Sequence, residues 1–236
     1  MRGLTGRGNA EFSGLYWAAL TLCYFASRLP LLGLGYGVDA DSWRLAAAGR
    51  SWLAGGGYSV SRAPGYPLTE LLAGFAPGYF TANMAVLVSG FALIVGFYYL
   101  ARELEIERYR VATTLLAFLP IFWKFSATTM GYVPATAAVV WSILAARRGK
   151  ALKAGVLLGI ALGFRLQSII ALPAIGWAMG FDRKDLKPAV KLGATSLVIA
   201  IILYLPSIIS GGFFGGVSEI GMGLRRRGIF FLYRGW

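Results

Sequence analysis

Histidine is absent from this sequence, cysteine occurs once, and only 10 of the 236 residues are acidic. Without histidine the chain lacks the commonest side chain for proton transfer at neutral pH and the commonest zinc ligand. The single Cys23 cannot form a disulfide within the chain, so cysteine usage does not indicate a redox compartment. Any acid-base chemistry of this protein must therefore rest on carboxylates.

Charged residues are also scarce, at 14% of the sequence, whereas hydrophobic residues make up 57%. Soluble domains carry about 25% charged residues, so this composition excludes a soluble domain and predicts an integral membrane protein. The net charge of +13 comes from lysines and arginines that lie between apolar runs. No base-stacking module interrupts these runs, so we expect membrane lipid or a phosphorylated ligand as partner, and no nucleic acid.

Six apolar runs are candidates for membrane helices, because a bilayer core of about 30 Å takes about 20 residues. They are residues 15–34, 80–100, 111–123, 132–146, 152–180 and 188–209. By the positive-inside rule, the basic loops between them predict a multi-pass protein with a cytoplasmic N-terminus. We expect residues 1–210 to form one transmembrane module and residues 211–236 to form a tail rich in glycine, aromatic residues and arginine.

The run 152–180 is too long for one crossing and too short for two. As a single helix it would extend about 42 Å at 1.5 Å per residue. Two short helices that meet near Phe164, Arg165 and Leu166 would form a hairpin, which is tolerated when it is buried among other helices. The positive charges of the loops do not distinguish a single crossing from a hairpin. The length of the run favours the hairpin. We therefore predict an all-α polytopic bundle of about six or seven helices, some of them short.

The long polar segment 35–79 falls on the external side in either topology. Within it, residues 41–53 have the pattern of an amphipathic interfacial helix, and a second helix begins at residue 66. The segment holds three of the ten acidic residues and three arginines, namely Asp39, Asp41, Glu70, Arg44, Arg50 and Arg62. An aspartate here can simply cap the interfacial helix. Alternatively, it acts as a general base or metal ligand beside arginines that bind a phosphate.

Several motifs resemble the opening of a GT-C glycosyltransferase, a polytopic membrane enzyme that uses polyprenyl-phosphate sugars. They are Arg28-Leu29-Pro30, Gly37-Val38-Asp39-Ala40-Asp41-Ser42-Trp43, and Ser61-Arg62-Ala63-Pro64-Gly65-Tyr66-Pro67-Leu68. The run 154–165, which ends in Arg165, is similar to a Gly-x-x-x-Gly-then-Arg segment of the same group. The group includes the protein O-mannosyltransferases and the aminoarabinose transferase of lipid A. The resemblance extends over about residues 15–206.

The resemblance implies a GT-C-like bundle that transfers a sugar, with inversion, from a polyprenyl-phosphate donor to a glycan, lipid or protein acceptor on the external face. It implies that Asp39 is the general base, with Asp41 as its competitor, and the pair is compatible with a divalent cation such as Mg or Mn. Arg62 and Arg165 would flank the lipid phosphate, because a guanidinium binds two oxygens at once. The other residues expected to bind substrate are Glu70, Tyr66 and Tyr132.

Two departures from the GT-C pattern leave other functions open. The second external loop, residues 124–133, has no acidic residue, and members of the family are commonly longer. The chain can therefore be a non-catalytic subunit whose partner supplies a C-terminal half. It can also be a transporter of anionic lipid, since an intramembrane Arg165 is costly without a function.

Plain structural roles also exist for the singled-out residues. Arg165 can snorkel to the interface, and Arg62 can form an ion pair with Glu70 or Asp41. The repeated Gly-x-x-x-Gly at positions 155, 159 and 163 predicts close helix packing in lipid rather than chemistry.

Overall fold

The computed structural model describes residues 5–180 and 185–214, and every regular element of two or more residues within these ranges is a helix. The α-helices are α1 (Thr5–Ala26), α2 (Ala40–Leu53), α3 (Pro67–Phe75), α4 (Tyr79–Glu103), α5 (Tyr109–Phe118), α6 (Pro120–Phe125), α7 (Tyr132–Arg147), α8 (Ala151–Phe164), α9 (Leu172–Ala178) and α10 (Lys187–Ile209). Two short 3-10 helices accompany them, η1 (Leu29–Gly33) and η2 (Leu166–Ala171). Of the predicted tail, only residues 211–214 lie within the described ranges.

Three described segments are long and apolar enough to cross a bilayer, namely Gly14–Gly33, α4 and α10. The helices α7 and α8 and the stretch Leu166–Ala178 are apolar but shorter. Large apolar side chains face outward on the long helices, for example Leu22 on α1 and Ile202 on α10, which are 71% and 59% exposed. Such surface is typical of a protein that faces lipid. The chain is therefore a helical membrane protein, while the number of crossings and the side of the N-terminus stay predictions.

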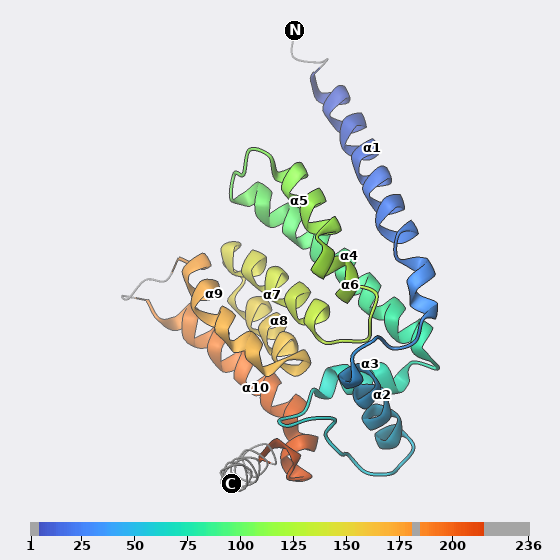
Figure 1. Cartoon of the computed structure of the whole chain (residues 1–236). Coiled ribbons are helices and arrows are strands. Elements are labelled where there is room, and N and C mark those ends of the chain that lie inside the picture. The colour runs from blue at the N-terminus through green and yellow to red at the C-terminus, as the bar shows by residue number, and fades with distance from the viewer. Residues whose placement is uncertain (1–4, 181–184, 215–236) are drawn as a thin grey trace, which may run out of the picture.

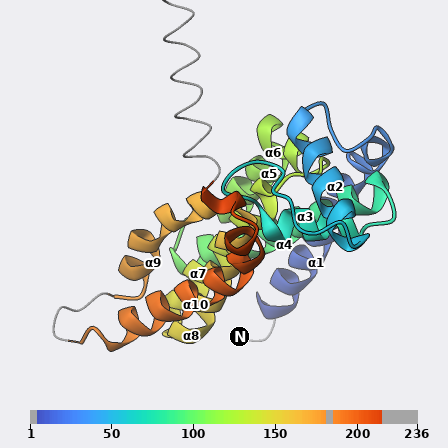
Figure 2. The same cartoon turned by 90° about the horizontal axis from the view of Figure 1, so that it is seen from below.

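The helices form a splayed arrangement with α2 and α3 at one end (Figure 1). Helix α7 packs against both α4 and α8, and α8 packs against α10. The view from below has α2 and α3 on one side of the molecule and α9 and α10 on the other (Figure 2). One apolar cluster joins α1, η1, α4 and α6 to α7, and a second joins α7 to α8, α9 and α10.

Glycines bring α8 against α10, as the Gly-x-x-x-Gly pattern predicts. A Cβ atom added at Gly155 would lie 2.7 Å from the carbonyl oxygen of Leu192, and one added at Gly159 would lie 2.5 Å from the Cβ of Ile199. Neither distance leaves room for a side chain. The predicted packing role of these glycines is confirmed.

The predicted break of residues 152–180 near Arg165 is confirmed, while the membrane topology of its two parts stays a prediction. Helix α8 ends at Phe164, and Arg165 adopts an extended conformation with φ −154° and ψ 118°. The chain then continues through η2 into α9, which packs against α7. Arg165 therefore lies at the turn of the hairpin, between α8 and η2.

Two predicted apolar runs have different boundaries in the structure. The run 111–123 is not one helix, because it divides into α5 and α6 at Pro120, whose missing N–H and ring prevent a continuous helix. The first helix begins at Thr5 and ends at Ala26, and η1 follows with Pro30 in its first turn. Pro30 has no N–H for the carbonyl of Ala26, four residues earlier, and its ring crowds that carbonyl, which accounts for the end of α1 at Ala26.

Arg28 of the Arg-x-Pro motif is fully buried. Its Nε donates to the hydroxyl of Ser126 at 2.7 Å, and its terminal nitrogens donate to the carbonyls of Tyr24 and Ala117. The guanidinium also lies over the ring of Tyr24, 4.0 Å from its centroid. A buried arginine needs such partners, so Arg28 ties the end of α1 to α5 and α6.

Candidate functional site

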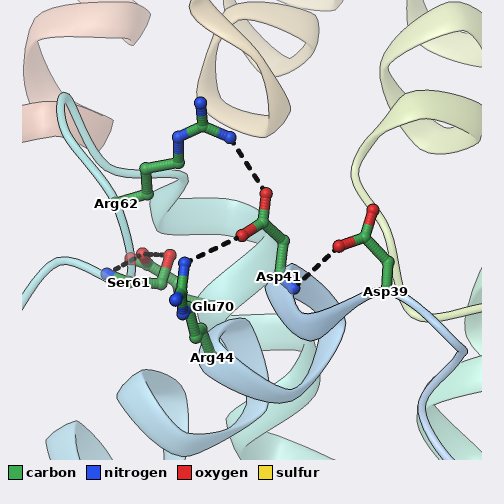
Figure 3. A network of polar contacts seen from close by, with 6 residues as sticks. All are labelled: Asp39, Asp41, Arg44, Ser61, Arg62 and Glu70. Carbon is green, nitrogen blue, oxygen red and sulfur yellow. Dashed lines mark hydrogen bonds and ion pairs between the residues drawn. The ribbon is translucent and has the colours of Figure 1, made fainter. Parts of the chain in front are cut away.

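Helix α2 begins at Asp39, whose side chain caps it. Asp39 Oδ1 accepts a hydrogen bond from the backbone N–H of Asp41 at 3.0 Å, with backbone angles of φ −84° and ψ 132° (Figure 3). Aspartate is among the preferred residues at this position because it satisfies a free helical N–H group. The capping role that the sequence left open for either aspartate therefore falls to Asp39.

The helix pair α2–α3 is held together by two glycines. A Cβ atom at Gly49 would lie 1.9 Å from the backbone oxygen of Glu70, and one at Gly74 would lie 2.6 Å from the backbone of Gly49. The two helices therefore touch through their backbones. This contact fixes the start of α2, and with it Asp41, relative to the segment that precedes α3.

Glu70 on α3 organises that preceding segment. Its carboxylate is fully buried. It accepts hydrogen bonds from the hydroxyl of Tyr58, from the backbone N–H of Ser61 at 2.9 Å and from the Ser61 hydroxyl at 2.6 Å. A longer contact of 3.4 Å joins it to the backbone N–H of Tyr66. Because its oxygens are occupied by these donors, Glu70 acts as an anchor for residues 58–66 and does not line the cleft described below.

Tyr58 is buried beside this carboxylate. Burial of its phenol and the adjacent negative charge of Glu70 raise the pKa of Tyr58 well above its ordinary value near 10. The hydroxyl therefore remains a proton donor to Glu70 throughout the physiological range.

Asp41 carries the ion pairs of the site. Its Oδ1 lies 3.3 Å from Nη1 of Arg44, one turn along α2, and its Oδ2 lies 3.0 Å from Nη1 of Arg62 (Figure 3). The predicted alternative of an ion pair between Arg62 and Asp41 is thus present. The side chains of Arg44 and Arg62 are 64% and 63% exposed, and ion pairs at such exposure contribute only about 0–1 kcal/mol. The arginines can therefore leave Asp41 at small cost.

A cleft opens beside Asp41, between the first external segment, the loop before α7 and the turn of the hairpin. The cleft is narrow and partly open to solvent. Its lining combines polar and aromatic side chains and comprises Asp41, Arg44, Leu45, Ser61, Arg62, Tyr66, Thr69, Met130, Gly131, Tyr132 and Arg165. Three arginines against one aspartate give these walls a net charge of +2, which favours an anionic ligand.

Hydrogen bonds hold the loop before α7 in place at this cleft. The hydroxyl of Thr129 donates to the side-chain oxygen of Asn83 at 2.7 Å, and its N–H donates to the carbonyl of Tyr36 at 2.9 Å. On the other side, Gly131 approaches α3 so closely that a Cβ atom would lie 2.5 Å from the hydroxyl oxygen of Thr69. That hydroxyl in turn donates to the carbonyl of Phe164 at 3.3 Å.

Arg165 reaches the cleft from the turn between α8 and η2. Its guanidinium carbon lies 3.9 Å from the ring centroid of Tyr132 and 5.5 Å from that of Tyr66. Within residues 5–180 and 185–214, no carboxylate forms an ion pair with it. A guanidinium on aromatic rings without a counter-ion keeps its charge available for an anion.

The same Arg165 and Tyr132 also line a second groove, which runs along α7 and η2. The other residues of this groove are Ala135, Thr136, Val139, Gln167, Ser168, Ile170 and Ala171, and its surface is mainly apolar. Its volume, including open solvent, is about 740 Å³. The cationic cleft and the apolar groove therefore meet at the Tyr132–Arg165 pair.

The divalent cation expected at Asp39 and Asp41 stays a prediction, although the surroundings of both carboxylates do not favour it. Asp39 is engaged as the cap of α2, and both oxygens of Asp41 face guanidinium groups, which repel a cation. Mg²⁺ and Mn²⁺ prefer sets of oxygen ligands, and among the described residues no group of three or more acidic or sulfur side chains comes together.

The structure thus brings together five of the residues predicted from the sequence, namely Asp41, Arg62, Tyr66, Tyr132 and Arg165. Asp39 and Glu70 stand outside the cleft and support its walls. Sequence reasoning missed the roles of Arg44 and Thr69. Arg44 follows Asp41 by three residues, the spacing at which opposite charges meet on a helix, so a signal for it existed. The sequence held no such signal for Thr69, because its partners lie far away in the sequence.

Comparison with known proteins gives no relative for this chain. No protein-family model, no curated protein and no solved structure matches it.

Proposed function

We propose that this protein is a membrane-embedded glycosyltransferase that takes a sugar from a polyprenyl-phosphate donor. The observation that carries the proposal is the junction at Tyr132 and Arg165, where a cationic cleft continues into a mainly apolar groove. A phosphate joined to a long hydrocarbon chain suits both surfaces, with its anion among arginines and its chain along α7. The sugar in this proposal rests on the motifs that resemble the GT-C enzymes.

In this proposal Asp41 is the general base and the arginines bind the phosphate. Arg62 exchanges its contact with Asp41 for a phosphate oxygen of the donor, which frees Asp41 Oδ2. Asp41 then takes the proton of the acceptor hydroxyl, the acceptor oxygen attacks the anomeric carbon, and the bond from that carbon to the phosphate oxygen breaks. The negative charge that develops on the departing lipid phosphate is stabilised by Arg62 and Arg165.

The geometry favours Asp41 over Asp39 for the role of base. Asp41 lines the cleft and its ion-pair partners are exposed, whereas Asp39 holds the first turn of α2 and is absent from the lining. The ranking of the two aspartates that the family resemblance implies is therefore reversed in this proposal.

One observation favours a second candidate, a non-catalytic subunit that binds lipid phosphate for a partner. Asp41 has an arginine on each oxygen, and a carboxylate in that state is a poor base until one arginine leaves. If neither arginine leaves when donor binds, Asp41 is a positioning residue, and the acid-base chemistry belongs to another chain.

Transfer from a labelled donor separates these candidates. Purified full-length protein is incubated with radiolabelled polyprenyl-phosphate hexose and a membrane extract as acceptor, with and without a chelator. Label in the acceptor that requires Asp41 supports the enzyme, and label retained in the donor despite donor binding supports the subunit. Because both oxygens of Asp41 face arginines, we expect the chelator to leave transfer intact.

A further inference from the structure

A second cationic groove lies at the opposite end of α8 from Arg165. It is formed by the turn before α8 and the first turns of α8 and α10, and is lined by Gly149, Lys150, Ala151, Leu152, Lys153, Val156, Lys187, Pro188 and Lys191. The groove is wide and open to its surroundings. Helix α8 is 14 residues long, so about 20 Å separates this lysine groove from the Arg165 cleft at 1.5 Å per residue.

The four lysines of the groove have no counter-ions among the described residues. None of them forms an ion pair within 5–180 or 185–214, and the nearby Asp185 accepts from the backbone N–H of Lys187 at 3.1 Å rather than from a lysine side chain. The arginines that end α7 differ, because Arg147 and Arg148 both pair with Glu103. Glu103 thus offsets part of the positive charge at the end of α7, whereas no described carboxylate pairs with a lysine of the groove.

Apart from its lysines, the lining of the groove is mainly apolar. Leu152 and Val156 on α8 and Pro188 on α10 belong to this lining, and Leu152 is 54% exposed. The close approach of α8 to α10 at Gly155 sets the width of the groove. A soluble anion would gain no binding free energy from the exposed apolar surface. A lipid, in contrast, presents an anionic headgroup directly above its acyl chains and can contact both.

We propose that the lysine groove binds the phosphate headgroup of an anionic phospholipid, with the acyl chains against Leu152 and Val156. Charge complementarity selects the lipid, since basic pockets between membrane helices bind such headgroups. The first turns of α8 and α10 both border the groove, and their free N–H groups add to the attraction. The proposal does not depend on glycosyl transfer, because the groove and the cleft share no residue.

Lipid titration of the delipidated full-length protein in a non-ionic detergent tests this proposal. The probe is fluorescent phosphatidylglycerol, compared with phosphatidylcholine of the same acyl chains and with inorganic phosphate. The test variant is Lys153→Gln/Lys191→Gln, which takes one charge from each helix of the groove. The matched control is Arg102→Gln/Arg108→Gln, which removes two exposed charges from α4 and the start of α5.

We expect phosphatidylglycerol to bind more tightly than phosphatidylcholine, and the test variant to weaken it about 10- to 30-fold, since each lysine near a membrane surface contributes about 1 kcal/mol. The control should retain the affinity of the unaltered chain. Equal weakening in both variants would mean a diffuse effect of net charge and would overturn the site. Competition by inorganic phosphate at the same concentration would also overturn it, because the ligand would then be a soluble anion. All four substituted residues are exposed, and the single variants Lys153→Gln and Lys191→Gln with unchanged thermal unfolding serve if the double variant is unstable.

Discussion

Asp39 and Asp41 are two residues apart, yet their carboxylates face different groups. The chain enters α2 at Asp39, so its side chain turns back to the N–H of Asp41 and becomes part of the helix end. Asp41 is already helical, and its side chain extends outward to Arg44 and Arg62. The position at which α2 starts, rather than the residue type, thus determines which aspartate caps the helix and which one faces the cleft.

This division predicts opposite results for two nearly isosteric substitutions. Asp41→Asn should lower transfer turnover by about 10²- to 10⁴-fold, the usual contribution of a general base, with little change in donor binding. Asp39→Asn should retain most activity, because asparagine caps helices about as well as aspartate. Steady-state kinetics on both variants, each checked for folding by thermal unfolding in detergent, measures the difference. Loss of turnover in Asp39→Asn with full activity in Asp41→Asn would return the role of base to Asp39.

At the scale of elements, the site depends on helices that touch through glycine. The contacts α2–α3 and α8–α10 both leave no space for a Cβ atom. The first positions Asp41, and the second supports the hairpin turn that carries Arg165. Substitutions far from the cleft should therefore affect it through packing.

The glycine contact of α8 with α10 gives a matched pair of variants. Gly159→Ala places a methyl group 2.5 Å from the Cβ of Ile199, whereas Gly193→Ala on α10 meets nothing within 4 Å. Overpacking typically costs about 1–3 kcal/mol, so Gly159→Ala should lower the thermal unfolding midpoint. Gly193→Ala should leave it unchanged or raise it, since alanine favours helix by up to about 1 kcal/mol. Equal midpoints in the two variants would refute the close contact.

The stability that Tyr58 gives to the segment before α3 should depend on pH in the alkaline range. The raised pKa of Tyr58 means that its contribution to stability is complete below about pH 10, where the unfolded phenol ionises, and is lost as pH rises toward the folded value. The unaltered chain should therefore exceed Tyr58→Phe in unfolding temperature by a constant margin between pH 7 and 9. The margin should shrink from pH 10 upward. A margin that stays constant to pH 11 would argue against a raised pKa of the buried Tyr58.

At the scale of the whole molecule, the account requires the cleft and the lysine groove to face opposite sides of the membrane. We expect position 61 to be external and position 150 cytoplasmic. In a Cys23→Ser background, cysteines introduced at these positions should react with an impermeant maleimide from opposite sides of sealed vesicles. Labelling of position 61 from the cytoplasmic side alone would put the cleft on the wrong face.

Much of the helical layout could be predicted from the sequence, because it follows from the lengths of the apolar runs. The runs 80–100 and 188–209 match α4 and α10 to within a few residues, and the hairpin at Arg165 follows from length alone. The break at Pro120 was foreseeable from proline chemistry. The start of α1 at Thr5 was not, since its first residues are mostly polar or glycine.

The site was harder to predict than the layout. Composition and motifs identified five of the residues that line the cleft. The assignment of Asp39 and Glu70 to support depends on where α2 starts and on the fold of residues 58–66. The burial of Arg28 likewise depends on the carbonyl of Ala117, at the end of α5. Contacts between such distant residues leave no periodic pattern in a single sequence.

The central claim is that one ligand, a phosphate on a hydrocarbon chain, occupies both the cleft and the groove that meet at Arg165. Binding of polyprenyl phosphate to the purified protein in detergent tests it most directly, with polyprenol and a water-soluble sugar phosphate as comparisons. We predict that only the intact polyprenyl phosphate binds tightly, and that Arg165→Lys weakens it although the charge is kept, because an ammonium cannot hold two phosphate oxygens in a fork. Equal binding of polyprenol, or unchanged affinity in Arg165→Ala, would contradict the account.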